Sequence, residues 1–323
     1  MAGFVYNEDI PFEERAKRAE QQRVHLLEPL GNDHPAITRR EIHIVSGCPE
    51  EPDAPEMELV IYRPTKATKR KLPVIYMIPA GGMFLCMLEV SPYWQLADKF
   101  NCVVALPRYR TAFQAPYPAA MNDCHAGYKY LVDNAETLGI NADKIVLMGC
   151  SSGTNLAMSL AFRLKRYGYR PRGCVTDMSF ADYRPIYATS TIRSGANWDA
   201  RCEFLSGLEY LRPNNLAWAE DPEMYPIFAT AEDCVGLCPM FIHVDSEEPS
   251  GASCKAFLDV LSKGGVYNEL HVWGGSSHGA LYNTWTFDDG SSDYVKRYSA
   301  VVDGNVTDCW KYDLRRNWIL DEL

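Results

Sequence analysis

Residues 144–168 constrain the fold of this chain more than any other segment. They begin with the apolar run KIVLMG, pass through Cys-Ser-Ser-Gly and end in TNLAMSLAFRLKRYG. A continuous apolar run is typical of a strand buried on both faces of a parallel sheet. The stretch after it predicts a long helix over about 152–168. The chain must therefore turn sharply from strand to helix, and Gly149 and Gly153 bracket that turn.

The rest of the chain repeats this alternation of strand and helix. Further apolar runs predict strands at 72–79, 102–107, 173–179, 239–245 and 268–274, with helices at 91–100, 118–137 and 251–264. Such alternation is typical of a mostly parallel, doubly wound α/β sheet flanked by helices. Two earlier segments, 41–46 and 58–63, alternate apolar and polar residues and predict edge strands.

Residues 180–237 interrupt the alternation. They are rich in Tyr, Trp, Arg and Asp, and they contain no continuous apolar strand. An insertion of this kind between two strands predicts a cap over the strand ends. We therefore expect an α/β core at 41–179 and 238–323, with 180–237 as a cap insertion.

The charge and the cysteine content argue against several classes of protein. The net charge of -10 disfavours nucleic acid or an anionic membrane surface as a partner. Eleven scattered cysteines without CxxC pairs favour free thiols in a reducing cytoplasm. No apolar run approaches the roughly 20 residues of a membrane helix, and the N-terminus lacks an apolar signal segment. The expectation is a cytoplasmic protein with no membrane or nucleic-acid partner.

The turn at 149–153 has the pattern G-x-S-x-G. A serine on a tight strand-to-helix turn exposes its hydroxyl, and the glycines relieve crowding there. Ser151 is therefore the candidate nucleophile, and the N–H of Ser152 at the helix start would face a developing oxyanion. Ser152 itself lacks two flanking glycines at this spacing, and Cys150 is expected to be a small buried hydrophobe. The alternative is a glycine-bracketed turn with no chemistry.

A serine hydroxyl needs an adjacent base, and the base needs an acid to orient it. His278 lies in the loop GGSSHGALYN just after the last predicted strand, which fits the chain order nucleophile, acid, base. The other six histidines lie on predicted strands, on a helix or in the N-terminal segment. Asp245, Glu247 and Glu248 follow a predicted strand and are candidates for the acid, and spacing does not choose among them.

The segment PAGGMF (79–84) follows the first buried strand. Its pair Gly81-Gly82 allows backbone N–H groups to approach a substrate closely, as an oxyanion hole requires. A plain turn is the alternative.

Five segments, taken in order, resemble the hormone-sensitive-lipase-like family of α/β-hydrolases, which includes bacterial esterases with an HGGG loop. AGGMF stands where the family has HGGGF, RYRTAFQAPYPAAMNDC is similar to YRLAPEHPFPAALEDC, and GCSSGTNLA is similar to GDSAGGNLA. SEEPSGASCKAF and SSHGA look like the family's strand-end D-P-L-R-D segment and its final histidine loop. The resemblance covers roughly residues 40–285 and implies the α/β-hydrolase fold.

The resemblance also implies roles for the matched residues. Ser151 would be the nucleophile and His278 the base. Gly81, Gly82 and the N–H of Ser152 would form the oxyanion hole.

The acid and the cap follow from the same resemblance. An ungapped match from Pro249 onward places the family's aspartate on Glu248, which favours Glu248 over Asp245 and Glu247. The family further implies that residues 1–40 form an N-terminal cap segment beside the insertion.

The chain departs from the family at four of these positions. Ala80 replaces the loop histidine, Met83 the third glycine, Cys150 an aspartate beside the nucleophile, and Glu248 the triad aspartate. The loop histidine supports the loop without transferring a proton, so its loss need not abolish activity. Residues 286–323 run longer than the family implies and receive no role.

These features predict a serine carboxylesterase that hydrolyses short-chain esters, acetyl to butyryl, through a Ser-His-Glu triad and an acyl-enzyme. Bulky residues near the oxyanion loop, Met83, Phe84, Tyr93 and Trp94, predict a compact substrate pocket. The expected partner is a small-molecule ester, no metal or organic cofactor is implied, and a homo-oligomer stays open. The alternatives are an amidase, peptidase or acyltransferase with the same triad, and a non-catalytic hydrolase-fold protein that binds a ligand.

Overall fold

The structure is a computed structural model. It describes residue 14 and residues 38–65, 71–83, 85–88, 96–97, 100–182, 220–245 and 250–273, with the backbone alone at 38–39, 245 and 271–273. The predicted N-terminal cap segment apart from Glu14 and residues 38–40, most of the predicted helix at 91–100, most of the cap insertion and residues 286–323 lie outside these ranges.

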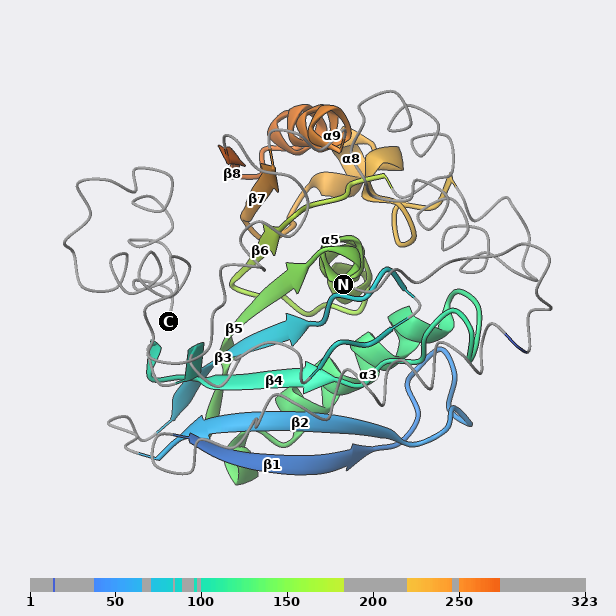
Figure 1. Cartoon of the computed structure of the whole chain (residues 1–323). Helices are drawn as coiled ribbons and strands as arrows, with labels where there is room; N and C mark the ends of the chain where they lie inside the picture. The colour runs from blue at the N-terminus through green and yellow to red at the C-terminus, as the bar shows by residue number, and fades with distance from the viewer. Residues whose placement is uncertain are drawn as a thin grey trace.

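In the described part of the chain, eight strands form one sheet (Figure 1). They are β1 (Thr38–Val45), β2 (Met57–Pro64), β3 (Leu72–Ile78), β4 (Val103–Pro107), β5 (Ile140–Cys150), β6 (Gly173–Asp177), β7 (Met240–Asp245) and β8 (Asn268–Trp273). Their order is β1-β2-β4-β3-β5-β6-β7-β8. The β1–β2 and β2–β4 pairs are antiparallel and the others are parallel, so the predicted mostly parallel sheet is confirmed.

The burial of the strands follows from their places in the sheet. Every residue of β3, β4 and β6 is buried, as expected of strands covered on both faces. β2 is also mostly buried, because it lies between β1 and β4. The prediction that 58–63 forms an edge strand is therefore wrong. β1 does lie at the edge, as predicted for 41–46, and its Ile42 and Ile44 are about half exposed.

In the described part of the chain, the helices pack against the sheet and against one another (Figure 1). They are α3 (Ala119–Asp133), α4 (Ala135–Leu138), α5 (Ser152–Arg166), α8 (Ala231–Cys234) and α9 (Gly251–Lys263), with a 3-10 turn η2 (Pro226–Phe228). Tyr76 on β3 donates to the carbonyl of Cys124 on α3, and Gly149 on β5 packs against Gly153 of α5. Tyr76 and Gly149 point to the same side of the paired strands, so α3 and α5 share that face.

The structure also bears on three other predictions, which concern the helix at 118–137, the cysteines and membrane-spanning helices. The helix predicted at 118–137 is divided at Asn134, where α3 ends and α4 begins. The nine cysteines within the described residues are buried thiols that form no disulfide among themselves. No helix in these stretches combines the length and the hydropathy that crossing a bilayer requires.

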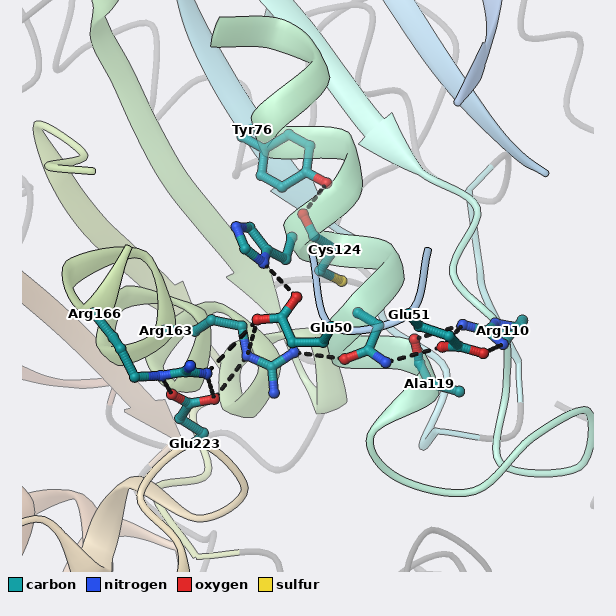
Figure 2. A network of polar contacts seen from close by, with 11 residues as sticks. Glu50, Glu51, Tyr76, Arg110, Ala119, Cys124, Arg163, Arg166 and Glu223 are labelled. Atoms are coloured by element: carbon teal, nitrogen blue, oxygen red, sulfur yellow. Dashed lines mark hydrogen bonds and ion pairs between the residues drawn. The ribbon is translucent and has the colours of Figure 1, made fainter. Parts of the chain in front are cut away.

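A network of charged side chains fastens the turn between β1 and β2 to α3 and α5 (Figure 2). Oε2 of Glu50 lies 2.9 Å from Nδ1 of His125 on α3. Oε1 of Glu50 lies 3.7 Å from Arg163 and 3.6 Å from Arg166, both on α5. Glu223 accepts from the Nε of each of these two arginines at 2.7 Å. The network thereby joins four segments that are distant in the sequence.

The neighbouring Glu51 extends the network towards β4 (Figure 2). Arg110 donates to both carboxylate oxygens of Glu51, at 2.9 and 2.7 Å, and also binds Asp123 on α3. Paired contacts of this kind are the strongest form of ionic hydrogen bond. Asn122 donates to Glu51 at 2.9 Å and accepts from Arg163 at 2.7 Å, so the two halves of the network are connected.

The charges of the network shift the pKa of Glu50. Burial raises that pKa, but the contacts with His125 and Arg163 lower it by more than burial raises it. The pKa therefore falls from 4.5 to about 2. The ionised carboxylate therefore stabilises the folded protein above about pH 4.5, and this contribution is lost as the pH falls towards 2.

A Glu50→Gln variant tests this contribution. We expect it to lower the free energy of unfolding by about 2 kcal/mol at pH 7, because it leaves the buried partners without their counter-charge. Urea unfolding at pH 7 and at several values between pH 5 and 3 measures the difference from wild type, which should shrink as the pH falls. A difference that stays constant over that range contradicts the prediction.

Glu136→Gln is the matched control. Glu136 pairs with Lys71 at the surface and is largely exposed. Exposed ion pairs of this kind contribute at most about 1 kcal/mol, so this variant should change stability little at any pH.

Candidate active site

Ser151 lies on the tight turn that joins β5 to α5. Its backbone has φ 53° and ψ -125°, and residues with side chains seldom adopt a φ in this left-handed region. Its exposed fraction is 6%. Backbone strain of about 1–3 kcal/mol persists only where the surrounding structure holds it, and it is concentrated at functional sites.

The glycines on either side of the turn provide the space that it needs. A Cβ on Gly149 would lie 2.3 Å from the carbonyl oxygen of Gly153, and a Cβ on Gly153 would lie 2.2 Å from that of Ile78. Both neighbours are backbone atoms of packed elements and cannot move aside. The close approach of α5 to β3 and β5 therefore requires glycine at both positions, as the sequence predicts.

Hydrogen bonds hold both peptide groups of Ser151. Its N–H donates to the carbonyl of Asp177, the last residue of β6, at 2.9 Å. Its carbonyl accepts from the N–H and the hydroxyl of Thr154 at 2.8 and 2.6 Å. That hydroxyl in turn accepts from the N–H of Phe180 at 3.0 Å. The segment 177–180 thus supports the turn on both sides of Ser151.

The loop after β3 approaches this turn with an unusual backbone. Gly81, Gly82 and Met83 have positive φ values of 136°, 64° and 67°. The N–H of Leu85 donates to the carbonyl of Gly81 at 2.9 Å. A Cβ on Gly81 would lie 2.1 Å from the carbonyl oxygen of Leu85, so the loop requires glycine at that position.

The backbone N–H groups of three residues were predicted to form an oxyanion hole. In the described part of the chain, the N–H groups of Gly81, Gly82 and Ser152 donate to no backbone carbonyl. Ser152 is the first residue of α5, and the first N–H groups of a helix have no acceptor within it. Amides in such places can stabilise charge that develops on a carbonyl oxygen attacked by the serine.

The segment after β4 tethers the loop. The hydroxyl of Tyr109, which is buried, donates to the carbonyl of Pro79 at 3.0 Å. The N–H of Ala112 donates to the carbonyl of Met83 at 2.7 Å. Arg110, between these two residues, belongs to the network of Figure 2. The loop therefore does not depend on a histidine at its start for its position.

A buried carboxylate and imidazole lie beside the turn, on the face of the sheet opposite α5. Oδ1 of Asp177 contacts Nδ1 of His243 on β7, and the two residues are 4% and 2% exposed. Asp177 pairs with Cys150 in the ladder between β6 and β5. A Cβ on Gly149 would point at α5, so the next residue, Cys150, and its partner Asp177 point to the opposite face. Sequence reasoning placed His243 within a strand and did not single out Asp177. The available signal was an aspartate in β6 and a histidine in β7, each in a mainly apolar strand.

Most of the remaining predicted site residues lie outside the described part of the chain. These are His278, Glu247, Glu248, Phe84, Tyr93 and Trp94. Asp245 ends β7, and its side chain is not among those described. Met83 is 1% exposed, which fits either a pocket wall or a core contact, so its predicted place in a pocket stays a prediction. Among the described side chains, no three His, Cys, Asp or Glu residues are grouped so as to hold a metal ion.

Comparisons with known proteins agree with this geometry. A family profile for the alpha/beta hydrolase fold matches residues 81–282. Esterase LipU of Mycobacterium tuberculosis is 29% identical over 222 residues, which cover 67% of this chain and 71% of the relative. Hormone-sensitive lipase of Mus musculus is 28% identical over 149 residues, 45% of this chain but 18% of the lipase. The structure of a bacterial heroin esterase superposes with a TM-score of 0.76 at 22% identity, covering 95% of this chain and 92% of that one.

The chain belongs to the alpha/beta hydrolase family, because the family profile covers more than half of its length. Its similarity to hormone-sensitive lipase and to a bacterial esterase confirms the predicted hormone-sensitive-lipase-like branch. The predicted α/β-hydrolase fold is confirmed as well.

A Tyr109→Phe variant tests the tether of the loop after β3, which was predicted to supply oxyanion donors. It removes the hydroxyl that binds the Pro79 carbonyl, so the Gly81 and Gly82 amides should be placed less precisely. We expect kcat/KM for p-nitrophenyl acetate to fall about tenfold, since small displacements of such donors cost one to two orders of magnitude. Steady-state kinetics on the purified variant measures the loss.

Tyr76→Phe is the matched control. It also removes one buried hydroxyl from a backbone carbonyl, that of Cys124 at 2.8 Å, but at the contact between β3 and α3. Each variant should lose about 1 kcal/mol of stability. Only Tyr109→Phe should lose activity, and equal losses of kcat/KM in the two variants would show that the tether has no special role.

Proposed function

We propose that this protein is a serine carboxylesterase that hydrolyses short-chain esters with Ser151 as its nucleophile. The chain is an esterase-type α/β-hydrolase, as its family and its esterase relatives indicate. The observation that carries the assignment of Ser151 is its strained backbone at the end of β5, between two glycines that admit no side chain. A serine held in this way presents its hydroxyl above the sheet, where a base can reach it.

The proposed reaction is acyl transfer in two steps. Oγ of Ser151 attacks the ester carbonyl while His278 takes its proton. The amides of Gly81, Gly82 and Ser152 stabilise the tetrahedral oxyanion, and one such donor typically contributes about 3–4 kcal/mol. His278 then protonates the leaving alcohol, and a water activated by the same imidazole attacks the acyl-enzyme and releases the acid.

The third member of the proposed triad is Glu248. It would hold the imidazole of His278 in the correct tautomer and stabilise the imidazolium that forms during the reaction. Glu248 follows the end of β7 by three residues, His278 follows the end of β8 by five, and β7 and β8 are parallel neighbours in the sheet. Carboxyl ends of parallel strands meet at one edge of a sheet, so this placement supports the assignment.

The proposed preference for short acyl groups rests on side-chain volume beside the oxyanion loop. Met83 stands where the family has glycine, and it adds volume where glycine has none. Phe84, Tyr93 and Trp94 follow closely in the sequence and would restrict the same pocket. Acetyl and butyryl are the acyl groups that such a pocket would admit best.

Hydrolysis of p-nitrophenyl esters by wild type and by Ser151→Ala tests the reaction and the nucleophile together. We expect the wild type to hydrolyse the acetate and butyrate, with rates that fall beyond an acyl length of about eight carbons. The Ser151→Ala variant should lose activity by about 10⁴-fold or more. Rates that rise with chain length would contradict the proposed pocket.

Ser159→Ala is the control for the nucleophile. It removes a buried hydroxyl from the same helix, one that has no partner in the described part of the chain. Its kcat should stay at the wild-type value. Wild-type protein that hydrolyses neither ester would count against the esterase proposal.

Three conservative substitutions test the assignment of the acid. We expect Glu248→Gln to lower kcat by about 10³–10⁴-fold, because the imidazole loses its orienting carboxylate. Asp245→Asn and Glu247→Gln should keep kcat near the wild-type value. If Asp245→Asn is the variant that loses activity, the acid is Asp245 and the ungapped match to the family fails.

A further inference from the structure

Asp177 and His243 form a tie between two strands at the point where the sheet itself stops joining them. The ladder between β6 and β7 ends at the pair Thr176 and Ile242. One residue further along each strand, the carboxylate of Asp177 contacts the imidazole of His243. The N–H of Ser179 adds a second tie, because it donates to the carbonyl of His243 at 3.0 Å.

This tie is directly bonded to the nucleophile turn. The carbonyl of Asp177 accepts the N–H of Ser151 at 2.9 Å, so the backbone that carries the carboxylate also fixes the strained serine. On the other side, His243 lies two residues before the end of β7, and the candidate acids are Asp245 at that end and Glu247 and Glu248 just after it in the sequence. His243 also pairs with His271 on β8, the strand that precedes the His278 loop.

Burying a hydrogen-bonded carboxyl group and imidazole in a sheet needs a reason. Removing a carboxylate and an imidazole from water costs several kcal/mol, and apolar residues of similar size would serve the sheet as well or better. Other buried positions on β6 and β7 are apolar, such as Val175 and Phe241. A pair kept at this position is best explained by the geometry that its directional contact imposes.

We propose that Asp177 and His243 are positioning residues that fix the nucleophile turn relative to β7 and β8. The inference rests on the proposed function, since it concerns the alignment of Ser151 with the acid and base that follow those strands. Neither residue takes part in the chemistry. Their contact sets the separation of the strand ends, and catalysis is sensitive to displacements of about 1 Å.

The test removes the pair without leaving one charge buried alone. In the Asp177→Val/His243→Leu double variant both side chains are apolar, and such replacements commonly preserve stability. We expect a folded protein whose kcat on p-nitrophenyl butyrate is about 30-fold lower, with KM within about threefold of wild type. A merely structural role would change the melting temperature without changing kcat. A folded double variant with wild-type kcat therefore overturns the proposal.

His243→Asn provides a second, independent test. Its side-chain amide can still donate to the carboxylate of Asp177, so the tie should persist. We expect kcat within about threefold of wild type, and a folded His243→Asn protein that loses more than about tenfold overturns the proposal. Such a loss overturns the proposal even if the double variant does not fold.

Labelling with a fluorophosphonate separates failure of this inference from failure of the proposed function. Wild-type protein that is active and labelled at Ser151 supports the esterase proposal, whatever the variants show. If wild type is labelled but hydrolyses no ester, the labelling rate constant takes the place of kcat, with the same expected loss of about 30-fold. Wild-type protein that is neither active nor labelled overturns both proposals.

Discussion

The positive φ of Ser151 places its side chain where neither the end of β5 nor the start of α5 would put it. A left-handed residue with a Cβ costs about 1–2 kcal/mol. Hydrogen bonds to both of its peptide groups, from Thr154 and to Asp177, offset this cost. The turn also needs Gly149 and Gly153, because α5 approaches the backbone of β3 and β5 too closely for any side chain. Strand, turn and helix therefore form one unit that cannot relax locally.

The network around Glu50 and Glu51 connects this unit of strand, turn and helix to the loop after β3. At the far end of α5, Arg163 is tied to Glu223, so the helix that begins at the nucleophile turn is held along its length. Arg110 is held by Glu51, and its neighbour Tyr109 binds the loop after β3. Losing one member of such a network leaves its partners charged and unpaired, which costs more than the pair itself contributes. The same set of ion pairs thus connects α5 with the segment that binds the loop after β3.

The sequence predicts the parts of this arrangement that have a local signature. Continuous apolar runs locate the central strands, and the glycines around Ser151 identify the turn, because each depends on neighbouring residues alone. The contacts of Glu50 with His125 and of Asp177 with His243 join segments far apart in the chain and leave no periodic pattern. The sequence wrongly predicts β2 as an edge strand, because polar residues near its two ends resemble the alternation of apolar and polar residues in an edge strand. The acid and the base lie outside the described residues and stay predictions.

Met83 has a positive φ, which is a backbone conformation that glycine adopts more easily. The family has glycine here, and Met83 adopts a positive φ of 67° in its place at a cost of about 1–2 kcal/mol. Its side chain is 1% exposed, and burying a methionine contributes about 1.5–3 kcal/mol. The carbonyl of Met83 also accepts the N–H of Ala112 at 2.7 Å. Burial and this hydrogen bond together exceed the strain, so packing holds the loop in a conformation that glycine would adopt freely. The amides of Gly81 and Gly82 can therefore keep their orientation although both the loop histidine and the third glycine are absent.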